Sequence, residues 1–366
     1  MLNVRQYFGG SSAPAAEPPA APVESPAAAR PRAYNAVVGQ LYARIDELRA
    51  KAQGGALAAA DLDAFEHQVA LFVSKFSSYA TINTKMKEDY DRLTLEAMSR
   101  RGVPDAIAFD YASAASDPAV RQAAIDAFRE HGAIVLKSAI GHDHVASIST
   151  ALLDLLQSNA ADIARMEFID RELYSIDGQG TAVKGYRAKA NYPKTLISQR
   201  TGLDRGLVDI FNIDFMMPDV GKALSDAVRS PLVFDVLKGS FETVEFENLN
   251  IYYNNGVTDT RGFHVDAYTP KAKIFLYLTD VEIEDGPYCV ALGSHKNLPL
   301  LKHNRRAHGM APFKETDVIY TPSEGATAFR GLKGDVIISC QHASHRGYPQ
   351  QAGHVRMMGV QSVRIG

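Results

Sequence analysis

The last third of the chain alternates short apolar runs with turns. From Val244 onward the pattern is typical of β-strands, and the run Phe246–Tyr253 places its residues alternately on two faces. A second run, Ile274–Leu278, mixes aliphatic and aromatic residues, and a third begins at Gly334-Asp335 and ends near His345. These runs predict a mainly β domain with α additions.

Helical spacing of apolar residues dominates the chain before residue 104. Three amphipathic helices are predicted there, with apolar stripes formed by Val38, Leu41, Ile45 and Leu48, then Leu62, Phe65, Val69, Phe72 and Phe76, then Ile82, Met86, Tyr90 and Leu93. Each stripe must pack against something. Two interpretations stay open: a helical cap on the following domain, or a hairpin that binds a partner or a second copy of the chain.

Composition changes sharply at both ends of this helical segment. Residues 1–32 are rich in Ala, Pro, Ser and Glu, and such a stretch cannot offset its ordering entropy by burial, so it is predicted to be a disordered tail. Gly102-Val103-Pro104 interrupts the helical pattern. The expected organisation is therefore a tail at 1–32, a helical extension at 33–104 and a β-rich domain at 105–366.

Charge and cysteine content exclude several classes of protein. The formal net charge of −3 gives no basic footprint for nucleic acid, and two cysteines are too few for a disulfide framework. No stretch of about 18 apolar residues is present, so no membrane span is predicted. We expect a cytoplasmic protein whose two thiols are buried and free.

Candidate metal ligands lie on both sides of the predicted strand Ile274–Leu278 in the sequence. His264 and Asp266 stand two apart, so on extended backbone an imidazole and a carboxylate point to the same side. A third ligand can come from His342 or His345, which lie three apart and would face opposite sides of a strand. Two histidines and one carboxylate are the ligands of non-haem Fe(II) oxygenases, although a zinc hydrolase could use the same residue types.

The stretch from Gly262 to Arg356 resembles the phytanoyl-CoA dioxygenase family of Fe(II)- and 2-oxoglutarate-dependent oxygenases. The resemblance is carried, in order, by His264-Val265-Asp266, Asp285-Gly286-Pro287, Gly293-Ser294-His295-Lys296, Gly334-Asp335, His345-Arg346-Gly347 and Arg356. It implies that His345 is the third iron ligand. It also implies that Arg356, at 356 − 345 = 11 residues further on, holds the distal carboxylate of 2-oxoglutarate. The chain departs from the family pattern at Leu292, where a proline commonly precedes the glycine.

This resemblance implies a jelly-roll core, or double-stranded β-helix, with flanking helices and a helical N-terminal extension. It further implies hydroxylation of an unactivated C–H bond of a small metabolite, with O₂ and 2-oxoglutarate consumed and succinate and CO₂ released. Asp266 keeps the carboxylate that halogenating relatives lack. The alternative is a non-catalytic metal-binding jelly-roll protein that acts in assembly, for example as a homo-oligomer, through its N-terminal helices.

One basic loop bears on the substrate. Lys184, Arg187, Lys189 and Lys194 lie beside Tyr186 and Tyr192 in a chain that is acidic overall. If this loop overhangs the metal, its charge favours an anionic substrate. A solvated surface cluster of charges is the other interpretation, and both stay open.

Overall fold

The structure is a computed structural model. It describes residues 26–58, 60, 61, 64, 68, 84–165, 173–175, 180, 181, 183, 185–200, 204–266, 270–296, 316–318 and 325–366. The chain divides into two compact units, Met1–Gln40 and Leu41–Gly366, and helix α1 (Pro26–Gln53) contributes to both. Within the described residues no helix is both long and apolar enough to cross a membrane.

Helix α1 begins earlier than the predicted tail boundary at residue 32. Pro26 is well suited to the first turn of a helix, and the alanines that follow have the highest helix propensity, so the same Ala/Pro composition that suggested a tail also starts a helix. Residues 1–25, the rest of that predicted tail, lie outside the described residues, as does most of the predicted helix at 62–76.

The remaining elements alternate short helices with strands. The helices are α3 (Thr84–Ser99), α4 (Tyr111–Ser116), α5 (Pro118–His131), α6 (His142–Ser158), α7 (Ala160–Arg165), α8 (Tyr186–Ala190), α9 (Pro218–Val228) and α10 (Pro231–Ser240). The strands are β1 (Ala108–Asp110), β2 (Ala133–Lys137), β3 (Leu173–Ser175), β4 (Gly180–Thr181), β5 (Leu196–Gln199), β6 (Val208–Phe211), β7 (Val244–Asn255), β8 (His264–Val265), β9 (Lys271–Tyr277), β10 (Tyr288–Ala291), β11 (Thr316–Asp317), β12 (Ala326–Phe329), β13 (Val336–Cys340), β14 (His345–Gly347) and β15 (Val355–Ile365).

Eight of these strands form a jelly roll. A ten-stranded sheet has the order β1-β2-β13-β9-β15-β7-β6-β5-β3-β4, and a five-stranded sheet has the order β11-β8-β14-β10-β12. From β7 to β15 the chain crosses repeatedly between the two sheets, so that β13-β9-β15-β7 face β8-β14-β10-β12. All neighbours within these two sets pair antiparallel, as the jelly-roll prediction requires.

Contacts between the sheets define which side of the large sheet faces inward. The Tyr277 hydroxyl on β9 donates to the Phe329 carbonyl on β12 at 2.7 Å, and the Tyr288 ring on β10 lies 4.3 Å from the Phe275 ring. Because side chains alternate along a strand, Lys273 shares this inner face with Phe275 and Tyr277. The intervening residues of β9 face the opposite way.

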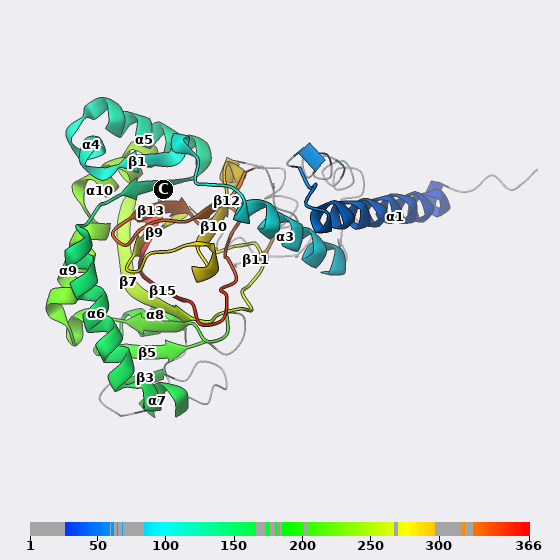
Figure 1. Cartoon of the computed structure of the whole chain (residues 1–366). Coiled ribbons are helices and arrows are strands. Elements are labelled where there is room, and N and C mark those ends of the chain that lie inside the picture. The colour runs from blue at the N-terminus through cyan, green and yellow to red at the C-terminus, as the bar shows by residue number, and fades with distance from the viewer. Residues whose placement is uncertain are drawn as a thin grey trace, which may run out of the picture. The chain divides into compact units, whose positions relative to one another are not determined.

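Helices cover the outer face of the large sheet (Figure 1). Helix α9 places Leu224 against Gly359 of β15, and the Ser149 hydroxyl of α6 donates to the carbonyl of Leu278 just after β9. Helix α5 ends at Gly132, whose φ of 74° allows the sharp turn into β2. The helix–strand succession expected from residues 120 to 136 is therefore present.

Helix α3 covers the outer face of the small sheet. Its buried Met98 packs in one apolar cluster with Phe263 and Val265, the residues on either side of His264. The Tyr348 hydroxyl also donates to the Leu95 carbonyl at 3.3 Å. Of the two interpretations of the N-terminal helices, α3 fits the helical cap.

Met98→Ala should lower the free energy of unfolding by about 2–5 kcal/mol, because it opens a cavity in a fully buried cluster. Urea unfolding followed by circular dichroism measures this change. Arg100→Ala is the control, one residue after the end of α3. Its side chain is exposed and pairs with Glu96 of the helix, so its cost should stay at about 0.5 kcal/mol. Equal midpoints for the two variants would show that α3 does not stabilise the sheet.

Candidate metal centre

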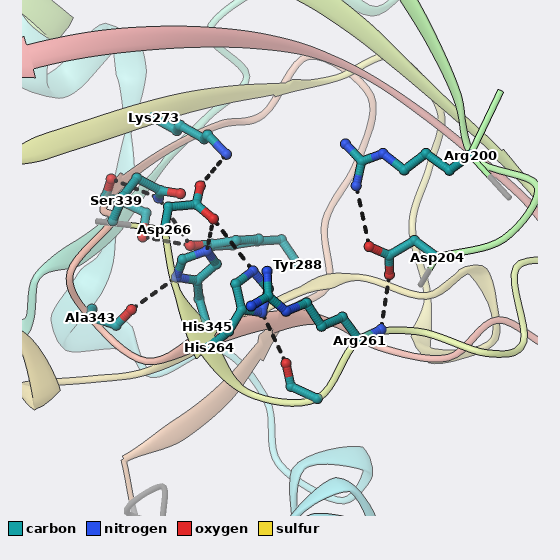
Figure 2. Close-up of polar contacts among 12 residues, drawn as sticks. Arg200, Asp204, Arg261, His264, Asp266, Lys273, Tyr288, Ser339, Ala343 and His345 are labelled. Atoms are coloured by element: carbon teal, nitrogen blue, oxygen red, sulfur yellow. Dashed lines mark hydrogen bonds and ion pairs between the residues drawn. The ribbon is translucent and has the colours of Figure 1, made fainter. Parts of the chain in front are cut away.

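Two short strands of the small sheet bring the proposed ligands together. Strands β8 and β14 pair antiparallel with His264 directly opposite His345, and their ring centroids are 4.5 Å apart. Asp266 follows β8, and its backbone N–H donates to the Gln341 carbonyl at 3.1 Å. One ligand atom from each of His264, Asp266 and His345 lies within 4.8 Å of the others, so this triad can hold a metal ion (Figure 2).

The ligand atoms face one another because their other polar atoms are engaged elsewhere. Asp266 Oδ1 lies 3.5 Å from His264 Nε2 and 3.6 Å from His345 Nε2. Each Nδ1 lies 2.9 Å from a carbonyl two residues earlier, that of Gly262 or Ala343. A carbonyl can only accept, so each Nδ1 must carry the proton and each Nε2 offers its lone pair to the cluster.

Burial and charge suit the centre to a cation. Burial alone would raise the pKa of Asp266, but the charge of the neighbouring Lys273 ammonium opposes it, and that pKa lies well below its usual range. Burial, followed by the neighbouring His264, lowers the pKa of His345. An ionised carboxylate and a neutral imidazole are the forms that bind metal.

His342, the rival to His345, points away from the triad. Its Nδ1 lies 3.3 Å from Cys340 Sγ, and its ring lies 6.0 Å from the ring of His295. Burial, with a contribution from His295, lowers the pKa of His342 to about 4. The predicted single strand ending in both histidines is wrong: β13 ends at Cys340 and β14 begins at His345, so His342 lies in the turn between two sheets. That turn, rather than strand alternation, separates the two side chains.

His295 packs against the end of α5 and lies outside the candidate triad. Its Nε2 lies 3.2 Å from the Arg129 carbonyl, and its ring fills the space where a Cβ on Gly132 would sit.

The two cysteines are buried and form no disulfide, and burial raises the pKa of each thiol to about 12. Neither group offers a metal-binding thiolate.

Arg356 is buried on the inner face of β15 with only 4% of its surface exposed. Its Nη1 donates to the Gly286 carbonyl and its Nη2 to Asn254 Oδ1 at 3.3 Å, whereas its buried Nε has no partner. Among the described residues no carboxylate lies within ion-pair distance of this guanidinium. Burial without such a partner lowers the pKa of Arg356.

The basic loop differs from the arrangement that its sequence suggested. Lys184 lies outside the described residues, and Arg187 and Lys194 are exposed. Lys189 is instead buried, with its Nζ 3.2 Å from Ser198 Oγ on β5 and 5.6 Å from the Phe211 ring centroid on β6. A lysine that packs on strands is not a free surface cation, and whether the loop contacts a substrate stays a prediction.

Sequence reasoning missed two groups of polar residues near the triad. Lys273 on β9 donates to Asp266 Oδ2 at 2.5 Å. Further along the large sheet, Arg200 Nε donates to Asp209 Oδ2 at 3.1 Å, and the other oxygen of Asp209 is buried without a partner. The inward parity of Lys273 could have been read from its strand, but no motif marks it, and only the pairing of the sheets shows that it meets Asp266.

No family model matches the sequence, and no curated protein matches it. Among solved structures, the chain is similar to the epimerase SnoN in complex with Fe³⁺, α-ketoglutarate and nogalamycin RO, at 11% identity over 68% of this chain and 85% of SnoN, with a TM-score of 0.42. It is also similar to HygX from Streptomyces hygroscopicus with nickel and 2-oxoglutarate bound (17% identity, 65% of this chain, 84% of HygX, TM-score 0.40). A third similar structure is EvdO2 from Micromonospora carbonacea var. aurantiaca complexed with 2-oxoglutarate (13%, 66%, 89% and 0.39, respectively). The jelly roll of this chain is shown by its own strand order, and the side-chain geometry brings together three residues that could hold a metal ion.

Proposed function

We propose that the protein is an Fe(II)- and 2-oxoglutarate-dependent oxygenase. His264, Asp266 and His345 would hold the iron, because two imidazoles and one carboxylate suit Fe(II) and leave positions for co-substrate and O₂. The resemblance of the Gly262–Arg356 stretch to the phytanoyl-CoA dioxygenase family supports the same assignment.

The observation that carries this proposal is the buried guanidinium of Arg356. A buried charge without an ionic partner is costly, so Arg356 favours an anionic ligand that enters the jelly roll. Its Nη2 would lie 3.9 Å from a Cβ on Gly347, which follows His345 by two residues on β14. Two residues of strand span about 7 Å, so a short dicarboxylate can reach from the metal to Arg356.

Arg356 suits the far end of such a ligand better than lysine would. A planar guanidinium can bind a carboxylate through two parallel hydrogen bonds, and it already has a fixed direction from Gly286 and Asn254. Gly286 has a φ of 72°, and a Cβ there would lie 2.6 Å from the Tyr348 carbonyl, so the turn that presents its carbonyl to Arg356 requires glycine. A zinc hydrolase would leave this arginine without a role.

Chemistry and positioning divide between the cofactor and the chain. Bound iron, with O₂ and 2-oxoglutarate, supplies the oxidation of a C–H bond, and succinate and CO₂ are released. The chain orients the ligands, binds the distal carboxylate through Arg356 and shields the centre, where the Tyr288 ring lies 5.8 Å from the His345 ring. Hydroxylation of a small, anionic metabolite is the specific reaction we propose.

Release of labelled CO₂ tests this function without a known substrate, because such enzymes also consume 2-oxoglutarate slowly when no substrate is bound. Protein loaded anaerobically with Fe(II) would be exposed to O₂ and carboxyl-labelled 2-oxoglutarate, and CO₂ and succinate would be measured together. We expect equal amounts of both products from the wild type and neither from Asp266→Ala. Metal binding without 2-oxoglutarate binding would instead favour the non-catalytic jelly-roll protein.

A further inference from the structure

In each of the three proposed metal ligands, the polar atom that does not face the cluster is hydrogen-bonded to another group. The Gly262 and Ala343 carbonyls hold the two histidines at Nδ1, and the Lys273 ammonium holds Asp266 at Oδ2, at 2.5 Å. Figure 2 shows the Asp266 carboxylate between this ammonium and the two imidazoles. The two histidine anchors are backbone atoms, so Lys273 is the one side chain among the three.

Lys273 reaches Asp266 from the opposite sheet. It lies on β9, where it pairs with Ser339 of β13 and Ser362 of β15, whereas Asp266 follows β8 of the small sheet. Its side chain is only 21% exposed. Strands β13 and β15 pair with β9 on its two sides and fix the backbone of Lys273. The hydrogen bond from Lys273 to Asp266 joins two charged groups, and such bonds are among the strongest in proteins. Lys273 can therefore fix the rotation of the carboxylate.

We propose that Lys273 is a positioning residue that makes Asp266 a ligand through Oδ1 alone. Oδ1 is the oxygen that lies 3.5 and 3.6 Å from the two imidazole Nε2 atoms, and Oδ2 is turned towards the ammonium. The hydrogen bond to Lys273 thus directs Oδ2 away from the two imidazole nitrogens and leaves Oδ1 facing them. This role rests on the proposed function, since it concerns the coordination positions that the reaction needs.

The number of donor atoms from the chain decides what else the metal can bind. With one oxygen from Asp266, the protein occupies three positions of an octahedral Fe(II) and leaves three, enough for a chelating 2-oxo acid and O₂ together. If both oxygens bound, one of those positions would be lost, and co-substrate and O₂ would compete. Carboxylates bind metals in either mode, so the choice must be imposed by neighbours.

A positive charge beside a cation site also has a cost. The Lys273 ammonium repels a bound divalent cation, so a lysine selected only for metal affinity would be disadvantageous there. Removing it should therefore leave Fe(II) affinity close to that of the wild type, because lost repulsion and lost orientation act in opposite directions. Removing Lys273 should instead impair the simultaneous binding of 2-oxoglutarate and O₂.

The test uses nitric oxide, which binds Fe(II) at the position open to O₂ and gives a strong electron paramagnetic resonance signal. Wild type, Lys273→Met and Lys273→Arg would be loaded with Fe(II) anaerobically and given nitric oxide, with and without saturating 2-oxoglutarate. Lys271→Met is the matched control: Lys271 lies on the same strand and face, but pairs with Glu247 at 3.7 Å, away from the ligands. Circular dichroism would confirm that each variant is folded.

In Lys273→Met we expect 2-oxoglutarate to weaken the nitrosyl signal at least about fivefold, with the Fe(II) Kd within about threefold of wild type. The signal should persist in the wild type and in Lys271→Met, and Lys273→Arg should restore most of it. A persistent signal in Lys273→Met would overturn the proposed role, as would a loss of Fe(II) affinity greater than about tenfold. A wild type that binds neither Fe(II) nor 2-oxoglutarate would instead refute the proposed function.

Discussion

His345→Ala should weaken Fe(II) binding by more than about a hundredfold, because even the outer partners of metal ligands contribute about 10- to 100-fold to metal affinity. His342→Ala should leave it within about twofold of wild type. The two histidines differ in what they contact. The Nε2 of His345 lies 3.6 Å from Asp266 Oδ1, whereas His342, in the turn after β13, contacts Cys340. His264→Ala and Asp266→Ala should behave like His345→Ala.

Anaerobic titration with Fe(II), followed by metal analysis of the gel-filtered protein, measures these affinities. His342→Ala is the control, since it removes another imidazole, partly buried, three residues away. The pKa of His342 is lowered to about 4, so this substitution removes no charge at neutral pH. Iron that is lost from His342→Ala and retained by His345→Ala would reverse the assignment of the third ligand.

Arg356→Lys should raise the Kd for 2-oxoglutarate by about 10- to 150-fold with little change in metal content. Replacing a planar, two-pronged donor with a single ammonium removes at least one charge-assisted hydrogen bond, which contributes about 1.5–3 kcal/mol. The net charge stays the same, so the loss would report geometry rather than electrostatic attraction. Isothermal calorimetry on the Fe(II)-loaded, anaerobic protein measures the constant.

Arg364→Lys provides the matched control for this variant. Arg364 lies on the same strand and the same inner-face parity, but it is mostly exposed and pairs with Glu245 and Glu247 at 2.9 Å. The Kd for 2-oxoglutarate should be unchanged in Arg364→Lys. An unchanged Kd in Arg356→Lys would move the carboxylate anchor to another residue.

Strand periodicity explains why so much of the site could be predicted from the sequence. The i, i+2 spacing of His264 and Asp266 predicts a common side, and both side chains do meet in the triad. The offset of His342 from His345 does not act through strand alternation, because a turn separates β13 from β14. The helical stripe ending at Leu93 likewise predicted α3, which runs Thr84–Ser99. Such features depend only on local geometry.

Contacts between distant strands could not be predicted in the same way. Lys273 meets Asp266 because β9 and β8 belong to different sheets that face each other, and nothing in the intervening residues encodes that approach. Burial of Lys189 against β5 and β6 has the same origin, since it depends on strands that extend the large sheet beyond the jelly roll. Local composition suggested an exposed basic loop, but tertiary packing determined the position of Lys189.

The packing of α3 on Phe263 and Val265 also bears on how short a segment of this chain can be and still fold around His264. Although the chain pattern changes near residue 104, the apolar neighbours of His264 are sheltered by residues that precede this change. A recombination event that joined residues 105–366 to a different N-terminal segment would expose those neighbours beside a metal ligand. We therefore expect the shortest segment that folds with a protected candidate metal centre to include α3 as well as the jelly roll.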